Sequence, residues 1–318
     1  MNNKNCINRR SFLKTSGTIT AGVALLNFNS VSTAQTAEKI SQSIRTATDQ
    51  VELGKTGIML SRLGFGCGTN SGAIQREMGQ EHFNRMIRHA YENGITYFDS
   101  AESYHTHTWL KEALKGIPRE KLFIQTKIPG WGIKNADEAF SRIEGYLKEL
   151  GTDYIDSLLI HCQTDAEWNQ KARPIMDGIS KAKEKKMIRT HGISAHSIPA
   201  LRTGLAEKWC ETMLIRLNPQ GHITDSETAA WNAPSSVDFI PTVVDLIKKI
   251  NHAGKGTIAM KLVGNGDFKK ASDREKAMRF AMNIKELNAA VIGFKNTEEV
   301  DESIERMNNA LKTSSLEM

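Results

Sequence analysis

Short apolar runs alternate with longer segments of helical periodicity from residue 51 to the end of the chain. Eight apolar runs predict strands, and they are Leu63–Gly66, Tyr97–Asp99, Leu122–Lys127, Ser157–His161, Thr190–Ser194, Met213–Leu217, Gly256–Met260 and Ala290–Phe294. Amphipathic segments predict eight helices, over residues 80–93, 107–115, 135–150, 175–186, 198–208, 236–252, 273–283 and 297–311. This alternation is typical of βα units, in which a helix follows each parallel strand.

The βα pattern predicts a (β/α)8 TIM barrel as a single α/β domain, since such barrels use about 250 residues. Gly94, Gly151 and Gly254 fall where a left-handed C-cap would end the first, third and sixth helices. A doubly wound sheet is the alternative. Its Gly-rich turn after the first strand is not matched by residues 64–68, which lack the required glycine spacing. A hairpin over residues 51–61 is expected to close the barrel floor.

The N-terminus follows a different pattern, with a basic start, a mildly apolar stretch at Gly17–Phe28 and small residues up to Ala34. These features predict a signal peptide over residues 1–34, because a membrane span needs about 20 apolar residues. Arg9 and Arg10, followed by Ser-Phe-Leu-Lys, resemble the twin-arginine export motif. A chance pair of arginines is the alternative interpretation.

Export predicts that the twin-arginine machinery is a partner, that the mature protein lies in the periplasm and that it keeps no stable membrane span. We expect cleavage after Ala34, a polar tether over residues 35–50, and a barrel domain over residues 51–318. Because this pathway carries folded proteins, we also hypothesise that the protein leaves the cell interior with its cofactor bound.

Charge and cysteine content exclude some other classes. The chain of 318 residues has a formal charge of +6, and the leader carries four of these charges. The remainder is nearly balanced, so there is no electrostatic reason to bind nucleic acid. The 4 cysteines include no Cys-x-x-Cys pair, which disfavours a disulfide framework, a zinc site or an iron–sulfur site.

Ionisable residues end three consecutive predicted strands, at Asp99, Lys127 and His161. Active sites of barrels lie at this end of the strands, and burying such groups costs several kcal/mol unless they pair or do chemistry. Alone, Asp99 could cap a helix, Lys127 could be a paired core lysine and His161 a satisfied histidine. Together with Tyr104 they suit carbonyl reduction by hydride from a cofactor, because an ammonium favours the phenolate and a neutral imidazole orients the oxygen.

These residues stand in motifs that resemble the aldo/keto reductase family over nearly all of residues 51–311. The motifs are Leu63–Gly66, Tyr97–Tyr104, Thr126–Lys127, Asp156–His161, Gly192–Ser194 and Val291–Phe294. The resemblance implies a TIM barrel, NADP(H) or NAD(H) as cofactor, and interconversion of a carbonyl and an alcohol. It also implies that Tyr104 is the general acid/base, that Lys127 lowers its pKa, that Asp99 holds Lys127, and that His161 orients the substrate oxygen.

The cofactor-binding residues that the resemblance implies are Ser194, Met260, Gly264, Gly266, Lys295, Asn296 and Thr297. Several of the family's cofactor contacts are altered. Ala195 stands where the family commonly has asparagine, Met260 where it often has a stacking tyrosine, and Leu214 or Ile215 where it has glutamine. Acidic residues replace the arginine that often grips a 2′-phosphate, so NAD and NADP both remain open.

Three residues are expected to line the substrate pocket: Trp131, Trp168 and His105; ordinary packing is the alternative for the two tryptophans. A non-catalytic cofactor-binding or regulatory barrel is the second functional hypothesis. A third is metal chemistry at converging ligands, namely Asp99, His105, His107 and His161, although we predict no metal site. The sequence leaves open the identity of the small carbonyl or alcohol substrate.

Overall fold

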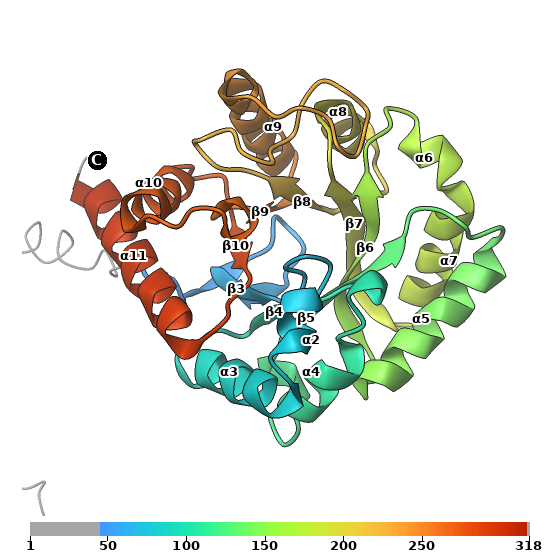
Figure 1. Ribbon diagram of the computed structural model, residues 1–318. Helices are drawn as coiled ribbons and strands as arrows, with labels where there is room; N and C mark the ends of the chain where they lie inside the picture. Colours follow the sequence, from blue (N-terminus) through green and yellow to red (C-terminus); the bar gives the residue numbers. More distant parts are fainter. Residues whose placement is uncertain (1–44, 317–318) are drawn as a thin grey trace, which may run out of the picture. The chain divides into compact units, whose positions relative to one another are not determined.

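The computed structural model describes residues 45–316, and eight parallel strands within them close into a barrel. The strand order around the barrel is β10-β3-β4-β5-β6-β7-β8-β9, so the last strand pairs with the first. The strands are β3 (Leu63–Gly66), β4 (Tyr97–Asp99), β5 (Phe123–Pro129), β6 (Ile155–Gln163), β7 (Ile188–Ala195), β8 (Thr212–Arg216), β9 (Gly256–Met260) and β10 (Ala289–Ile292). The closed ring in Figure 1 confirms the predicted TIM barrel and excludes the doubly wound sheet.

Helices surround the barrel and cover the outer faces of its strands (Figure 1). The longer ones are α3 (Gln80–Glu92), α4 (His107–Ala113), α5 (Ala136–Leu150), α7 (Arg173–Glu184), α8 (Ile198–Ala206), α9 (Ile240–His252), α10 (Ala271–Met282) and α11 (Thr297–Leu316). Each overlaps a predicted segment. Short helices also occur in the loops: α2 (Ala73–Glu77), α6 (Trp168–Lys171), η1 (Glu102–Tyr104), η2 (Arg119–Lys121), η3 (Val237–Phe239) and η4 (Gly264–Gly266). Apart from η3, which lies within the helix predicted over residues 236–252, the sequence did not predict them, because so few turns carry no periodic signal.

The ends of α5 show how local sequence fixes a helix. The Asn135 side chain accepts a hydrogen bond from the backbone N–H of Glu138 at 2.9 Å, which caps the N-terminus. Gly151 ends the helix with a φ of 65°, a left-handed conformation that glycine adopts without a Cβ penalty. Gly94 and Gly254 also have positive φ, so the three predicted C-caps are confirmed.

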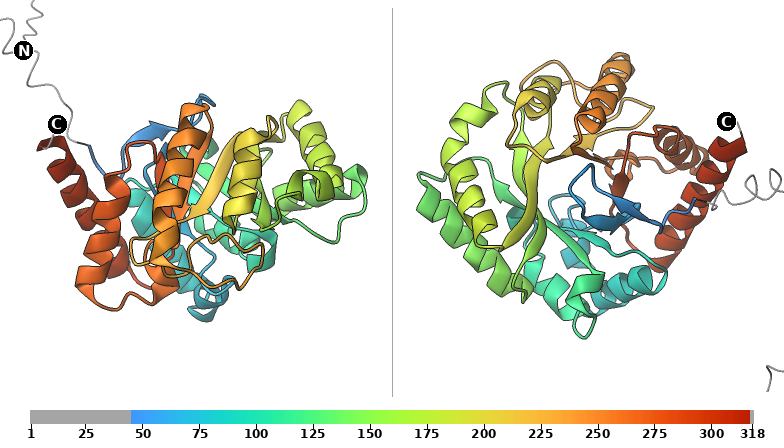
Figure 2. Two further views of the ribbon diagram at one scale, coloured as in Figure 1. Left: turned by 90° about the horizontal axis from the view of Figure 1, so that it is seen from above. Right: turned by 180° about the vertical axis from the view of Figure 1, so that it is seen from behind.

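A hairpin of β1 (Gln50–Glu52) and β2 (Met59–Ser61) closes the floor of the barrel. Leu53, Ile58 and Leu60 are buried within the barrel interior. The right-hand view of Figure 2 shows this hairpin in blue across the end of the barrel. The expected hairpin is therefore confirmed, and it leaves the opposite, carboxyl end of the strands for the site.

The barrel interior has an apolar layer near the floor and a polar layer above it. Because strand side chains alternate between faces, residues two apart point the same way. Tyr97 and Phe123 pack edge to face at 5.1 Å between ring centroids. Asp99, two residues after Tyr97, and Lys127, four after Phe123, therefore lie at the carboxyl end of the same interior.

The domain begins earlier in the chain than predicted. Ala47 is fully buried, and its backbone N–H donates to Asn308 Oδ1 at 2.7 Å. The tether predicted over residues 35–50 is therefore wrong at its C-terminal end, because residues 45–50 pack onto the barrel. The predicted signal peptide, residues 1–34, lies outside the described residues. Among residues 45–316, no helix has the length and apolar character needed to cross a membrane.

Candidate active site

Asp99 and Lys127 form a buried ion pair at the carboxyl ends of β4 and β5. Lys127 Nζ donates to Asp99 Oδ1 at 2.6 Å, to Asp99 Oδ2 at 2.7 Å and to the Ser100 carbonyl at 2.7 Å. The exposed fractions of the two side chains are 1% for Lys127 and 6% for Asp99. Removing one partner of such a pair typically costs about 3–5 kcal/mol, since a buried charge is left alone. The pair is therefore held rigidly where a ligand would meet it.

Gln125 supports this ion pair from below. Its Nε2 donates to Asp99 Oδ1 and to the Tyr97 hydroxyl, both at 2.8 Å. Gln125 was not among the predicted site residues, although its place two residues before Lys127 on β5 puts both side chains on the same face of the strand.

Tyr104 completes the group of four residues that the resemblance implied. It lies on η1, directly after β4, and its hydroxyl is 3.3 Å from His161 Nε2 on β6. Lys127 Nζ is 4.9 Å from the centre of the Tyr104 ring. The structure thus brings Asp99, Tyr104, Lys127 and His161 together; below they are called the tetrad.

The Tyr104 hydroxyl and the His161 imidazole are both neutral at pH 7. Burial and the negative charge of Asp99 raise the pKa of Tyr104 well above its ordinary value of 10.0. The resemblance implied that Lys127 lowers this pKa; in the structure the raising effects of burial and of Asp99 dominate. Burial and the positive charges of Lys127 and Lys261 lower the pKa of His161 well below its ordinary value. The neutral phenol and the neutral imidazole can therefore both donate a hydrogen bond to a carbonyl oxygen.

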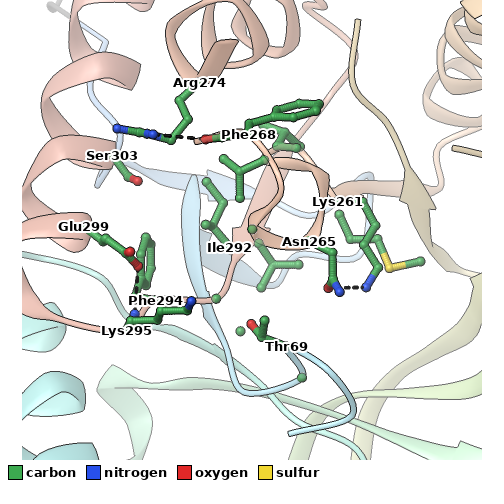
Figure 3. A pocket seen from close by; sticks show the side chains of 18 of the residues that line it. Thr69, Lys261, Asn265, Phe268, Arg274, Ile292, Phe294, Lys295, Glu299 and Ser303 are labelled. Atoms are coloured by element: carbon green, nitrogen blue, oxygen red, sulfur yellow. Dashed lines mark hydrogen bonds between the residues drawn. The ribbon is translucent and has the colours of Figure 1, made fainter. Parts of the chain in front are cut away.

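An elongated cavity of about 340 Å³ begins beside the tetrad. At that end it is lined by Asp99, Tyr104, Leu214, Met260 and Lys261, and at the far end by Arg274, Lys295, Glu299, Glu302 and Ser303. Figure 3 shows this separation, with Lys261 and Asn265 on one side and Arg274, Glu299 and Lys295 on the other. Leu214 lines the cavity, whereas Ile215 packs in the outer core. Leu214 is therefore the residue that stands in place of the family's glutamine.

Two glycines and two lysines shape the walls of the cavity. A Cβ built on Gly293 would lie 2.1 Å from Thr69 Oγ1, so only glycine permits this close approach of the two sides. Gly266 has a φ of +95°, and a Cβ at this residue would meet no atom within 4 Å, so space is open there. Lys269 and Lys295 add positive charge along the wall. A dinucleotide cofactor is compatible with these features.

The predicted cofactor residues divide into two groups. Met260, Gly266 and Lys295 line the cavity. The others are not among its lining residues: Ser194, Gly264, Asn296 and Thr297. Gly264 is covered by the Phe268 ring, which lies 2.8 Å from where a Cβ would be. Asn296 instead caps α11, since its Oδ1 accepts from the Glu299 backbone N–H at 2.9 Å.

The three residues predicted for the substrate pocket also have different environments. Trp131 follows β5 at the carboxyl end and is 60% exposed. His105 is exposed on the loop after η1, with a φ of 56°. Trp168 does not line the cavity; it is buried in the outer core, and its Nε1–H donates to the Ala200 carbonyl at 3.2 Å. For Trp168 the packing alternative is correct.

The metal hypothesis fails on the position of His107. Its Nδ1 is 2.7 Å from Glu149 and its Nε2 is 2.6 Å from Thr126 Oγ1, so both ring nitrogens are engaged away from the tetrad. Within residues 45–316 no three His, Cys, Asp or Glu side chains are grouped to hold a metal ion.

Two further features near the tetrad were missed. Arg216 at the end of β8 forms a buried ion pair with Asp225 at 2.7 Å. His196, just after β7, stacks on Trp231 with 4.5 Å between the ring centres. The partners lie in the loop between β8 and α9, whose irregular sequence gave no signal of contact.

Comparison with known proteins agrees with this geometry. The chain is 30% identical over 166 residues to "Probable aldo-keto reductase 1" of Glycine max, covering 48% of this chain and 46% of that protein. It is 30% identical over 152 residues to the methylglyoxal reductase DkgB of Escherichia coli O157:H7, covering 46% of this chain and 55% of that protein. The matches thus span about half the length of these relatives.

A solved aldo-keto reductase from Bacillus halodurans superposes with a TM-score of 0.66 at 16% identity, over 84% of this chain and 96% of that one, which supports the fold. The model of the aldo/keto reductase family matches residues 62–318. This chain therefore belongs to the aldo/keto reductase family.

Proposed function

We propose that the protein is an oxidoreductase that interconverts a carbonyl compound and an alcohol with a nicotinamide dinucleotide. The observation that carries the proposal is the contact of 3.3 Å between the Tyr104 hydroxyl and His161 Nε2, above the buried Asp99–Lys127 pair. Membership of the aldo/keto reductase family supports this reaction class, and the elongated cavity beside Tyr104 supports a dinucleotide.

The bound cofactor would supply the hydride; the side chains supply orientation and a proton. Tyr104 keeps its proton at neutral pH, so it can donate to a carbonyl oxygen as negative charge develops there. Neutral His161 offers a second hydrogen bond to the same oxygen. Lys127, fixed by Asp99, places a positive charge near this oxygen, which favours the transition state over the ground state.

Apolar side chains keep water from this end of the cavity. Leu214, Met260 and Val291 line it, and all three belong to the buried cluster inside the barrel. A dry wall strengthens the electrostatic interactions of the tetrad. Met260 would lie against a nicotinamide ring, which a thioether can cover.

The decisive experiment compares wild type with Tyr104→Phe on a panel of aldehydes, with NADH and NADPH in parallel. We expect kcat to fall about 10²- to 10⁴-fold, because general acid catalysis is lost. Circular dichroism and cofactor binding, followed by tryptophan fluorescence, should remain as in wild type. Full turnover by Tyr104→Phe would contradict the assignment. No turnover by wild type on any carbonyl would favour the non-catalytic, cofactor-binding alternative.

We also propose, from the sequence of residues 1–34, that the folded protein is exported by the twin-arginine pathway to the periplasm. Transport in the folded state would allow the cofactor to cross with the protein. The exported enzyme could then cycle one bound cofactor between an oxidisable and a reducible substrate.

A further inference from the structure

Tyr104 is carried by η1, a helix of only three residues between β4 and α4. So short a helix has few hydrogen bonds of its own, and its neighbours therefore decide where it lies. Its first residue, Glu102, contacts α5 through both carboxylate oxygens. Arg142 donates to Oε1 at 2.9 Å, and the Tyr146 hydroxyl, one turn further along α5, donates to Oε2. One face of α5 thus holds the first residue of η1.

Tyr146 also contacts α4, which lies beside α5 on the outside of the barrel (Figure 1). Its buried ring packs edge to face against the ring of His107, with 5.2 Å between the centres. His107 Nε2 lies 2.6 Å from Thr126 Oγ1, and Thr126 directly precedes Lys127 on β5. These contacts connect the helix of Tyr104 with the strand of the lysine. We call them the outer network, and its members are Glu102, Arg142, Tyr146, His107 and Thr126.

Two further contacts tie the segment around η1 to the other tetrad residues. The hydroxyl of Ser100, directly after Asp99, is 2.9 Å from the Thr106 hydroxyl. The hydroxyl of Ser103, the middle residue of η1, is 3.5 Å from His161 Nδ1. Consecutive residues of η1 therefore face the two ring nitrogens of His161. A displacement of η1 would change the distance between the phenol and the imidazole.

The outer network stabilises the position of η1 more than that of α5. The helix α5 is already held on the barrel by apolar side chains, since Ala139, Ile143 and Leu150 are buried. The three residues of η1 are only half-buried. The ion pair between Glu102 and Arg142 is also partly exposed, so it adds little to the stability of the whole domain. Its effect is local, on where η1 lies.

We propose that Glu102 and Tyr146 are positioning residues, which hold the Tyr104 hydroxyl in place against the rest of the tetrad without contacting the substrate. This inference rests on the proposed carbonyl–alcohol function. Proton transfer needs the donor within about 2.6–3.2 Å of the acceptor, so a small shift of η1 lowers kcat. Cofactor binding is unaffected, because the members of the outer network are not among the residues that line the elongated cavity.

The test measures kcat of network variants on the best aldehyde of the panel. Tyr146→Phe removes only a hydroxyl and keeps the ring. We expect kcat to fall about tenfold, less than the roughly 10²-fold that a misplacement of 1 Å costs, because the contacts of η1 with Arg142 and Arg76 remain. Glu102→Ala removes both contacts with α5 and should cost more, whereas Glu102→Gln should restore part of the loss.

Two matched controls should behave as wild type. Tyr154→Phe removes a hydroxyl at the opposite end of the barrel, since Tyr154 directly precedes β6, and Glu144→Gln changes an exposed carboxylate on α5. Circular dichroism and the dissociation constants of NADH and NADPH should be unchanged in every variant. Tyr146→Phe is the milder change should Glu102→Ala disturb folding. Wild-type kcat in both Tyr146→Phe and Glu102→Ala would overturn the inference.

A double variant separates positioning from a merely structural role. If Tyr146 acts through Tyr104, Tyr146→Phe should have no further effect on the residual turnover of Tyr104→Phe, because residues that act as a unit are not additive. A structural role would lower turnover by the same factor in both backgrounds, and this result would overturn the inference.

The position of Tyr104 can also be followed without turnover. The chain has 5 tyrosines, so the nuclear magnetic resonance signals of isotope-labelled tyrosine rings can be assigned to Tyr104 by comparison with Tyr104→Phe. The Tyr104 signal should shift in Glu102→Ala and stay in place in Glu144→Gln. An unmoved signal in Glu102→Ala would overturn the inference and leave the proposed function intact. Failure of wild type to reduce any carbonyl would instead refute the proposed function.

Discussion

Gly68 lies directly against the ring of Tyr104. A Cβ at Gly68 would be 2.4 Å from Tyr104 Cε2 and 2.9 Å from its hydroxyl oxygen, so any larger residue must displace the ring. Gly68→Ala should therefore move the phenol relative to His161 and lower kcat about 10²-fold, the effect of a misplacement of roughly 1 Å. Steady-state kinetics on the best aldehyde would measure this.

Gly145→Ala is the control for that substitution. Gly145 lies within α5, and a Cβ there would meet nothing within 4 Å. This variant should keep the kcat of wild type and gain about 0.5–1 kcal/mol in the free energy of unfolding, because alanine is the better helix former. Wild-type kcat in Gly68→Ala would show that the position of the Tyr104 ring is not critical.

The Arg216–Asp225 pair should make stability depend on pH. Asp225 is fully buried, and its pKa is raised to about 6 from 3.8 because burial outweighs the favourable effect of Arg216. The folded state then binds a proton more tightly than the unfolded state, so ionisation of Asp225 lowers stability as pH rises from about 4 to about 6. The loss amounts to about 3 kcal/mol for a shift of this size.

Asp225→Asn removes this contribution. The difference in the free energy of unfolding between the variant and wild type should shift in favour of the variant as pH rises from 4 to 7. Urea unfolding at each pH measures this difference. Arg216→Met should instead lose about 3–5 kcal/mol at pH 7, since it leaves a buried carboxylate without its cation. A stability difference between Asp225→Asn and wild type that stays constant with pH would refute the raised pKa.

Three of the four tetrad residues could be predicted because each stands at the end of an apolar strand. An apolar run with one ionisable residue at its end fixes both the strand and the place of that residue, as for Asp99, Lys127 and His161. The sequence alone therefore predicted that these side chains meet at one end of the barrel. The direction of the Tyr104 pKa could not, because it depends on how deeply the ring is buried and on how close Asp99 lies.

Residues in loops escaped prediction for a different reason. Trp168 belongs to a helix of four residues, too short to show which face is buried. The contact between Arg216 and Asp225 depends on the irregular path of the loop that follows β8. Glu299 carried a visible charge in the sequence, but only its position on α11 shows that it lines the cavity.

The carboxylate of Glu299 should favour NADH over NADPH. It lies at the far end of the cavity and accepts a hydrogen bond from the Lys295 backbone N–H at 2.8 Å. The guanidinium of Arg274 is bonded to Glu302 and to the carbonyls of Phe268 and Lys269, so it is not free to grip a 2′-phosphate. A carboxylate repels that phosphate, whereas it can accept from a ribose hydroxyl.

Glu299→Gln should therefore reduce the ratio of kcat/KM for NADH to that for NADPH about tenfold, or about 1.4 kcal/mol. Glu305→Gln is the matched control, because Glu305 is exposed on the same helix and does not line the cavity. An unchanged cofactor ratio in Glu299→Gln would exclude this residue as the determinant of preference.

Export predicts a defined mature protein. When the full chain is expressed in a bacterium with the twin-arginine machinery, intact-mass measurement of the periplasmic protein should show a chain that begins at Gln35, after cleavage behind Ala34. Replacing Arg9 and Arg10 by lysine should retain the uncleaved precursor in the cytoplasm, although its charge is unchanged, whereas Lys4→Arg should be exported normally. Export of the double variant at the wild-type level would show that the arginine pair is not the signal.

Native mass spectrometry of the exported protein should also detect bound nicotinamide dinucleotide, and an empty barrel there would refute transport with the cofactor.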